Sequence, residues 1–231
     1  MTTQDVQGFS LKTFSAAVIG VGGLGCNIAV HLVGAGIREL LLFDGDRISS
    51  SNLNRQFLYN PSDVGENKAD TAAKRLRAYN PQCEISSFPV RLTKNNIPER
   101  LQSCDMIFLA ADNKAARELL SDFSYENNIP LVFGGIDGFY GKMYLYLPRH
   151  SPCPYCAGVL DGKKAEYNVS AAAGIIGSLQ AATGIRYLIS GDTSLSGRLH
   201  IYDGDSFSSL KIIPSENCQR CSFQGKEKHY D

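Results

Sequence analysis

A candidate phosphate-binding segment lies early in the chain. Residues 20–25 read GVGGLG, directly after an apolar run and before a helix-like segment. Glycines let backbone amides approach a phosphate closely, and a helix N-terminus adds partial positive charge there. Asp44 follows about twenty residues later, at the end of the next apolar run, where an acid can accept hydrogen bonds from ribose hydroxyls. On these features alone, an NAD or FAD domain is the simplest interpretation.

Two cations and a second carboxylate point to different chemistry. Arg55 lies in the polar segment SSSNLNRQF, Lys68 opens the next helix-like segment, and Asp112 ends a later apolar run. Hydride transfer builds no charge on phosphorus, whereas nucleotidyl transfer at the α-phosphate of ATP uses Arg and Lys against phosphate charge and Asp to hold Mg²⁺. Each residue alone has a simpler explanation: a surface ion pair for Arg55, a solvated lysine for Lys68, and a helix N-cap for Asp112.

The elements that would position these residues alternate along the chain. Strand-like runs are expected at residues 16–21, 39–44, 83–88, 106–110 and 130–135, and helix-like segments at 26–36, 67–80 and 113–128. Residues 141–148 then alternate like an antiparallel strand, and 198–213 read as a hairpin turning at Asp203-Gly204-Asp205. We expect one α/β domain over residues 1–231, with a Rossmann-like, doubly wound, mostly parallel sheet and antiparallel C-terminal strands.

A long apolar segment, residues 170–190, is expected to be a helix and is rich in Gly, Ala and Ser. Small residues let another helix approach closely, so the segment is either a core helix or a subunit interface. Periodicity does not separate the two.

Four of the seven cysteines form two CxxC pairs, Cys153/Cys156 and Cys218/Cys221. Four thiolates make a closed tetrahedral zinc site, which is structural because no position is left for water. A redox pair is the competing interpretation, but it would need only one CxxC. Zinc would tie the C-terminal segment to the residues after Tyr146. Cys26, Cys83 and Cys104 lie in or beside apolar elements and are expected to be packing residues.

Several motifs together resemble the E1-like adenylating enzymes of the molybdopterin-synthase and thiamine sulfur-carrier pathways: GVGGLGC, DGD, SNLNRQF, the segment from Gly65 to Lys68, the Asp112-Asn113 pair and GSLQA. The resemblance runs from about Ala17 to Cys221. It implies that ATP is held by Gly20, Gly22, Gly23, Asp44, Asp46, Ser51, Asn52, Arg55, Lys68, Asp112 and Asn113. It further implies that Arg55, Lys68 and Asp112 carry catalysis, with Asp112 as the Mg²⁺ ligand, and that the protein is a homodimer.

In that family, the C-terminal carboxylate of a small ubiquitin-like protein attacks the α-phosphorus and releases pyrophosphate. Such a carboxylate is ionised near pH 7 and needs no general base, so positioning and charge neutralisation can supply most of the catalysis. The expected substrate is therefore a ubiquitin-like sulfur-carrier protein. A small-molecule carboxylate, as in assembly of the guanylylpyridinol cofactor of iron hydrogenase, and tRNA threonylcarbamoyladenosine dehydration are the alternatives.

Two segments depart from the family pattern. Relatives carry an N-terminal arginine that enters the partner's ATP site, but residues 1–15 here contain no arginine. Relatives that form a thioester place a cysteine in the crossover segment, but none occurs between Cys156 and Cys218. The chemistry is therefore expected to stop at the acyl-adenylate, and another molecule must supply the sulfur or other nucleophile that consumes it.

Composition narrows the partners. Lys and Arg number 23 and so do Asp and Glu, which disfavours a nucleic-acid or membrane partner because either normally calls for a basic surface. The first 14 residues carry no signal or transit pattern, and no long apolar segment predicts a membrane span. The expected location is the cytoplasm.

Overall fold

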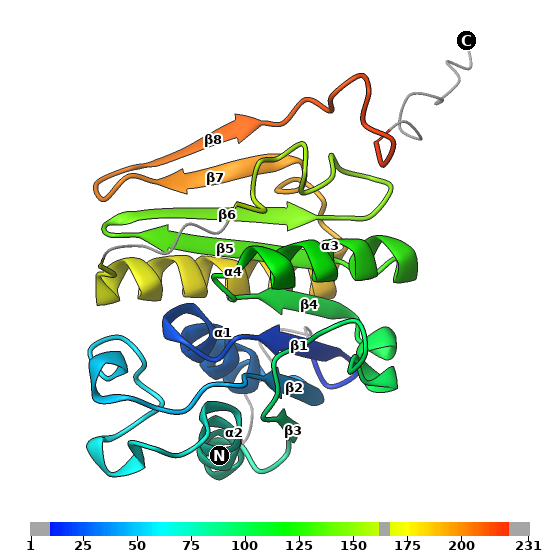
Figure 1. The fold of residues 1–231 in the computed structure, drawn as a ribbon. Coiled ribbons are helices and arrows are strands. Elements are labelled where there is room, and N and C mark those ends of the chain that lie inside the picture. The colour runs from blue at the N-terminus through cyan, green and yellow to red at the C-terminus, as the bar shows by residue number, and fades with distance from the viewer. Residues whose placement is uncertain (1–9, 162–166, 222–231) are drawn as a thin grey trace.

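A computed structural model describes residues 10–161 and 167–221 of the chain. Its central feature is one eight-stranded sheet in the order β3-β2-β1-β4-β5-β6-β7-β8 (Figure 1). The first five strands in that order are parallel, and β6, β7 and β8 each run antiparallel to the preceding neighbour. The expected mostly parallel sheet with antiparallel C-terminal strands is confirmed.

The parallel half is built from β1 (Ser15–Ile19), β2 (Glu39–Phe43), β3 (Glu84–Phe88), β4 (Met106–Leu109) and β5 (Leu131–Asp137). The antiparallel half is β6 (Tyr140–Tyr146), β7 (Arg198–Tyr202) and β8 (Phe207–Lys211), with the predicted hairpin turn between β7 and β8. Chain order reverses direction in the sheet between β1 and β4, and ligands of such sheets bind beside the strand ends at that switch point.

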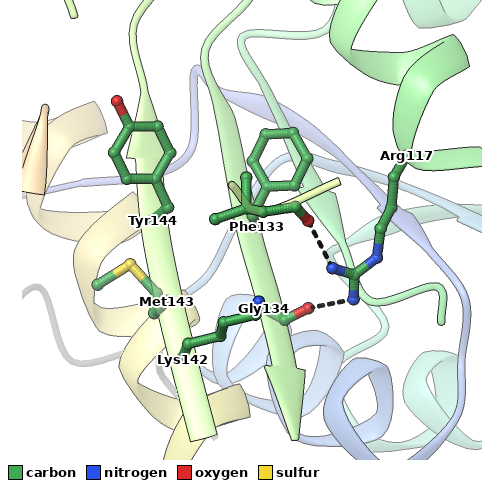
Figure 2. A pocket seen from close by; sticks show the side chains of 7 residues that line it. Arg117, Phe133, Gly134, Lys142, Met143 and Tyr144 are labelled. Atoms are coloured by element: carbon green, nitrogen blue, oxygen red, sulfur yellow. Dashed lines mark hydrogen bonds between the residues drawn. The ribbon is translucent and has the colours of Figure 1, made fainter. Parts of the chain in front are cut away.

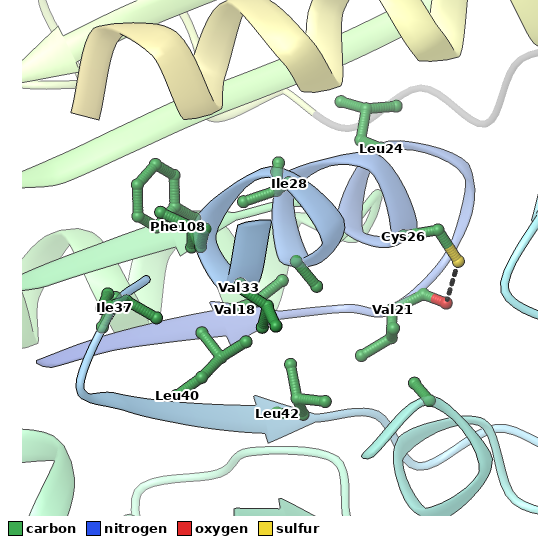
Figure 3. Close-up of a cluster of buried hydrophobic side chains, with 14 of the residues drawn as sticks. Val18, Val21, Leu24, Cys26, Ile28, Val33, Ile37, Leu40, Leu42 and Phe108 are labelled. Atoms are coloured by element: carbon green, nitrogen blue, oxygen red, sulfur yellow. Dashed lines mark hydrogen bonds between the residues drawn. The ribbon is translucent and has the colours of Figure 1, made fainter. Parts of the chain in front are cut away.

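Helices cover both faces of the sheet. They are α1 (Gly23–Gly34), α2 (Lys68–Tyr79), α3 (Lys114–Asn127) and α4 (Ser170–Ser190). Alternate residues of β1 serve opposite cores: Ala16 and Val18 join the cluster under α1, α2 and α4, whereas Ala17 and Ile19 join the cluster under α3. Buried parallel strands are apolar on both faces for this reason. Figure 3 shows the first cluster, with α1 packed against β1 and β2.

The long helix α4 is a core helix through its small residues. A Cβ on Gly177 would lie 2.7 Å from the Leu24 carbonyl oxygen of α1, and a Cβ on Gly184 would lie 2.3 Å from Phe108 Cζ of β4. Only glycine allows these approaches. The core interpretation is confirmed for this face, and the fold needs no partner chain to explain it.

The helix boundaries follow the capping residues. Asn67 caps α2 by accepting hydrogen bonds from the amides of Ala69 and Asp70, and Asn113 caps α3 by accepting one from Ala116. Asn113, and not Asp112, is therefore the N-cap of α3. Within the described residues, no helix is long and apolar enough to cross a bilayer.

Candidate active site

One groove lies along the C-terminal ends of the parallel strands and continues over β5 and β6. It brings together every residue that the sequence assigned to the nucleotide: Gly20, Gly22, Gly23, Asp44, Asp46, Ser51, Asn52, Arg55, Lys68, Asp112 and Asn113. Strand ends converge there because parallel strands finish at the same edge of a sheet. Geometry therefore joins residues that lie up to about ninety positions apart in the chain.

The glycine loop is shaped for close backbone approach. Gly20 has φ +90°, and a Cβ on it would meet the carbonyl oxygen of Ala110 at 3.0 Å. A Cβ on Gly25 would fall 1.9 Å from the Gly20 carbonyl oxygen, so only glycine lets α1 start this close to β1. Unlike α2 and α3, α1 has no side-chain cap, because its N-cap is Gly22. The free amides of its first turn are donors suited to a phosphate.

Asp44 fixes the loop to the end of β2. Its Oδ2 accepts a hydrogen bond from the Val21 amide at 2.7 Å, and its Oδ1 accepts one from the Asp46 amide at 2.8 Å. Burial raises the pKa of Asp44, while Lys68 and the two amides act in the opposite direction. The carboxylate stays at the groove with lone pairs left for a ribose hydroxyl.

The SNLNRQF segment folds back on itself and positions the Arg55 side chain beside the glycine loop. Asn52 Oδ1 accepts a hydrogen bond from the Ser49 amide at 3.3 Å, which closes a short 3₁₀ turn over Ser50–Asn52. Arg55 donates to the Ser51 carbonyl at 3.1 Å, and its Cγ and Cδ lie 3.5 Å from where a Gly23 Cβ would be. Among the described residues Arg55 has no carboxylate partner, so its charge is available to an anion in the groove.

Lys68 sits at the start of α2 with its side chain only 8% exposed. Its ammonium lies 3.2 Å from Asp46 Oδ2, while Arg91 donates to Asp46 Oδ1 at 2.7 Å. The hydrogen bond from Arg91 is the main cause that lowers the pKa of Asp46. Asp46 thus holds two cations at one wall of the groove.

Asp112 lines the groove directly before α3. In the described part of the chain its carboxylate has no hydrogen bond or ion pair, and the charges of Arg91 and Arg117 act on it favourably. An unpaired carboxylate is a suitable oxygen ligand for Mg²⁺. The Asn113 side chain is already used as the α3 cap.

Among the further groove residues that escaped the sequence interpretation are Gln56, Arg91, Arg117 and Lys142. Gln56 belongs to the quoted SNLNRQF motif, is 3% exposed, and has an Oε1 without a partner in the described structure. Motif context could have selected it. The other three lie outside any motif and reach the groove only through the packing of β3, α3 and β6 around it.

The four CxxC cysteines form a second cluster, on the face of the sheet that carries α3. All four Sγ atoms lie within 4.8 Å of one another. The Sγ atoms of Cys153 and Cys218 are 3.5 Å apart, and those of Cys156 and Cys221 are 3.8 Å apart. A tetrahedral zinc with Zn–S bonds of about 2.3 Å places its sulfurs about 3.8 Å from one another, so the arrangement fits the ion.

Backbone and side-chain contacts connect this cluster to α3. The Cys153 amide donates to Cys221 Sγ at 3.2 Å, a bond that favours thiolate. Arg220, between the last two cysteines, forms an ion pair with Asp122 of α3 and lies 4.5 Å from the centre of the Tyr155 ring. Cys26, Cys83 and Cys104 are all buried, as expected for packing residues.

Comparison with known protein families shows to which family the chain belongs. The family model described as "ThiF family" matches residues 5–223, nearly the whole chain. The chain belongs to the ThiF family. The resemblance to E1-like adenylating enzymes is thereby confirmed.

Named relatives in the ThiF family are adenylyltransferases. The sulfur carrier protein adenylyltransferase of Thermus thermophilus is 36% identical over 91% of this chain and 83% of its own. The molybdopterin-synthase adenylyltransferase of Salmonella typhimurium is 31% identical over 92% of this chain and 88% of its own. The adenylyltransferase and sulfurtransferase MOCS3 of Culex quinquefasciatus is 35% identical over 94% of this chain, which spans about half the length of that relative (52%).

A solved structure is similar as well. The crystal structure of E. coli MccB with ATP superposes with a TM-score of 0.80 at 22% identity, covering 91% of this chain and 67% of that one. At this identity the likeness supports the fold. MccB has also been crystallised with AMPCPP and MccA.

Two features singled out from the sequence lie outside the described residues. They are residues 1–9 of the arginine-free N-terminus and residues 162–166 of the cysteine-free crossover segment.

Proposed function

We propose that this ThiF-family chain adenylates the C-terminal carboxylate of a ubiquitin-like sulfur-carrier protein with ATP and releases pyrophosphate. The observation that carries the proposal is the groove itself, which gathers a glycine loop with free amides, Arg55, Lys68 and Asp112. The names of the Thermus and Salmonella relatives support the same reaction.

In this proposal different groove residues bind different parts of the nucleotide. Gly20, Gly22 and Gly23 with the first turn of α1 receive the phosphates, and Asp44 accepts hydrogen bonds from the ribose. Asp46, Ser51, Asn52 and Asn113 complete the contacts to ATP. Asp46 and Asn52 act mainly through neighbours, because Asp46 pairs with Lys68 and Asn52 closes the turn before Arg55.

The reaction forms a bond between a carboxylate oxygen and the α-phosphorus. It breaks the bond from that phosphorus to the oxygen bridging the β-phosphate, and the electron pair leaves with pyrophosphate. Negative charge increases at the phosphorus and on the leaving group. Arg55 and Lys68 lie where two fixed cations offset this charge without reorganising, which lowers the barrier.

Asp112 is the residue that would hold Mg²⁺. Its unpaired carboxylate at the groove fits a divalent cation that prefers oxygen ligands. When bound, the ion would offset phosphate charge. Asp112 itself keeps its place because α3 starts immediately after it, with Asn113 as the cap.

We further propose that Cys153, Cys156, Cys218 and Cys221 hold one structural zinc. The sulfur spacing and the amide donated to Cys221 support this, and no position remains for a catalytic water. The ion would fasten the C-terminal segment against α3.

A homodimer is the remaining part of the proposal. The packed face of α4 serves this chain's own core, but its other face leaves Ala171, Ala182 and Arg186 exposed and Ile175 and Leu179 partly buried. That outer face of α4 is the surface that would contact a second copy.

Exchange of labelled pyrophosphate into ATP tests the function. We expect exchange that depends on a ubiquitin-like carrier ending in Gly-Gly and is absent when the carrier's C-terminus is amidated. The assay should include small carboxylic acids and tRNA as comparators. Exchange with a small acid but not with the carrier would contradict the substrate assignment, and no exchange with any carboxylate would contradict the reaction.

A further inference from the structure

Two basic side chains meet in the groove beyond the residues assigned to ATP. Arg117 of α3 and Lys142 of β6 both approach Gly135 of β5: a Cβ there would lie 3.2 Å from Arg117 Nη2 and 3.8 Å from Lys142 Cε. Figure 2 shows the two side chains on either side of Gly134. Because Gly135 carries no side chain, the space between the two cations is not filled from the β5 strand.

Arg117 is fixed in place by neutral acceptors. It donates from Nε to the Ala111 carbonyl at 3.1 Å, from Nη1 to Val159 at 2.7 Å and from Nη2 to Gly134 at 3.0 Å. It is 5% exposed, and burial lowers its pKa. No carboxylate pairs with it in the described structure, so a rigid positive charge remains with two of its five N–H donors free.

Lys142 is half-buried and has no hydrogen bond or ion pair within residues 10–161 and 167–221. The charged groups that act on it are Arg117 of α3, which repels it, and Asp161 of the following loop, which attracts it. Asp161 has a side chain 81% exposed and lies 3.9 Å from Lys114. Holding an unpaired ammonium out of water costs free energy, which an uncharged residue here would avoid.

The place of Lys142 along one face of β6 explains why this lysine is half-buried. Lys142, Tyr144 and Tyr146 share one face of the strand, and the two tyrosines are buried in the core under α3. Lys142 is the residue at which that face leaves the core and enters the groove. Its half-buried side chain therefore lines the groove.

The ligand should be an anion that the nucleotide residues do not already hold. In the proposed reaction, the second anion that enters the groove is the ionised C-terminus of the carrier. A planar carboxylate has two oxygens, which suit an ammonium on one side and a guanidinium on the other. The missing side chain of Gly135 leaves room for it between the two cations.

We propose that Lys142, supported by Arg117, is the specificity-determining residue that receives the C-terminal carboxylate of the substrate as it enters the groove. This inference rests on the proposed function and adds to it the side chain that distinguishes an ionised C-terminus from an uncharged one. A site built around a charged group rejects the ligand that lacks its partner.

The test compares two carriers with four proteins. A ubiquitin-like carrier ending in Gly-Gly is made with a free carboxylate or a carboxamide, and its Kd is measured by calorimetry with the α,β-methylene analogue of ATP at saturation. The proteins are the unchanged chain, Lys142→Gln, Lys142→Arg and Lys74→Gln. Lys74 is an exposed lysine of α2 and serves as the matched control.

We expect the unchanged chain to bind the carboxylate form on the order of 10- to 100-fold more tightly than the carboxamide, as a charge-assisted hydrogen bond provides. In Lys142→Gln the preference should fall to about threefold or less. Lys142→Arg and Lys74→Gln should keep it, and the Kd of the ATP analogue should stay unchanged throughout.

Each contrary result has a distinct meaning. If Lys142→Gln keeps the preference while pyrophosphate exchange is normal, the assignment of Lys142 is wrong and the function stands. If Lys142→Gln instead weakens the ATP analogue, the pair binds nucleotide phosphate and the inference is overturned. If the unchanged chain neither binds a carrier nor supports exchange, the proposed function fails and this inference fails with it.

Discussion

The parallel and antiparallel halves of the sheet contribute to the groove in different ways. In the parallel half, Asp44 directly follows β2 and Asp112 lies in the short segment between β4 and α3, and the loop and helix after β2 add Arg55 and Lys68. In the antiparallel half, Lys142 projects from within a strand, and the cysteine cluster joins segments about sixty residues apart. Site residues that follow strand ends can be recognised from local sequence. A site on the face of a strand depends instead on which distant elements pack over that face.

Replacing the cations of the parallel half should have the largest effect. We expect Arg55→Ala and Lys68→Ala each to slow carrier-dependent pyrophosphate exchange about 10²- to 10³-fold, because each removes a charge that stabilises the transition state. Lys74→Ala, in the same helix as Lys68 but exposed, should keep full exchange. Near-normal exchange in either groove variant would remove the stated role of that residue.

Loss of the zinc proposed at the cysteine cluster should lower the stability of the protein more than its adenylation rate. Protein purified without chelator should contain about one zinc per chain. Cys218→Ser should abolish zinc binding and lower the unfolding free energy by several kcal/mol, about 10 °C in Tm. Cys83→Ala, at a buried cysteine away from the cluster, should keep its zinc. A metal-free chain with an unchanged Tm would contradict the structural role.

Two glycines of α4 test how this helix packs. The helix contacts strands of both halves of the sheet, so its packing bears on both. Gly177→Ala should cost about 1–3 kcal/mol in urea unfolding, since the new methyl would overlap the Leu24 carbonyl. At Gly174 the nearest atom to a new Cβ is 4.0 Å away, so Gly174→Ala should raise stability by up to about 1 kcal/mol. Equal effects would mean that α4 does not pack on α1 as described.

The parallel half could be predicted from sequence almost completely. Glycine spacing and apolar runs act over a few residues, so the sequence predicts a helix over residues 170–190, with the bounds observed, and an acid, Asp44, at the end of a strand. The eleven residues that the family resemblance assigns to ATP share one groove, because the strand ends of a doubly wound sheet, with the loops that follow them, converge by topology.

The proximity of Arg117 and Lys142 could not be predicted from local sequence patterns. Lys142 reads as one polar position of an alternating strand, and Arg117 as one of several charges on a helix. Their proximity depends on the β5–β6 register and on α3 lying over that face, which are long-range contacts without a local signal. Arg91 escaped for the same reason, because its partner Asp46 is 45 residues away.

The smallest expected effect is a pH dependence at Asp46. Its pKa is lowered in the folded state, so its contribution to stability is present above the unfolded pKa of about 4 and is lost as pH falls through the folded value. Unfolding by urea at about pH 6 and about pH 3 should show a steeper acid loss in the unchanged chain than in Asp46→Asn. The difference should be well under 1 kcal/mol, because the side chain is 44% exposed. Asp205→Asn, in the β7–β8 turn, is the control, and an Asp46→Asn curve parallel to the unchanged chain would contradict the pairing.

The most direct test of the central claim follows the carboxylate oxygen itself. A Gly-Gly carrier labelled with heavy oxygen in its C-terminal carboxylate is incubated with ATP and this chain, and the product is cleaved with hydroxylamine, which attacks the acyl carbon. If the carboxylate attacks the α-phosphorus in this groove, the AMP released carries one heavy oxygen by mass spectrometry, and Arg55→Ala yields almost none. Formation of unlabelled AMP alone would contradict the account, because the carboxylate would not have been the nucleophile.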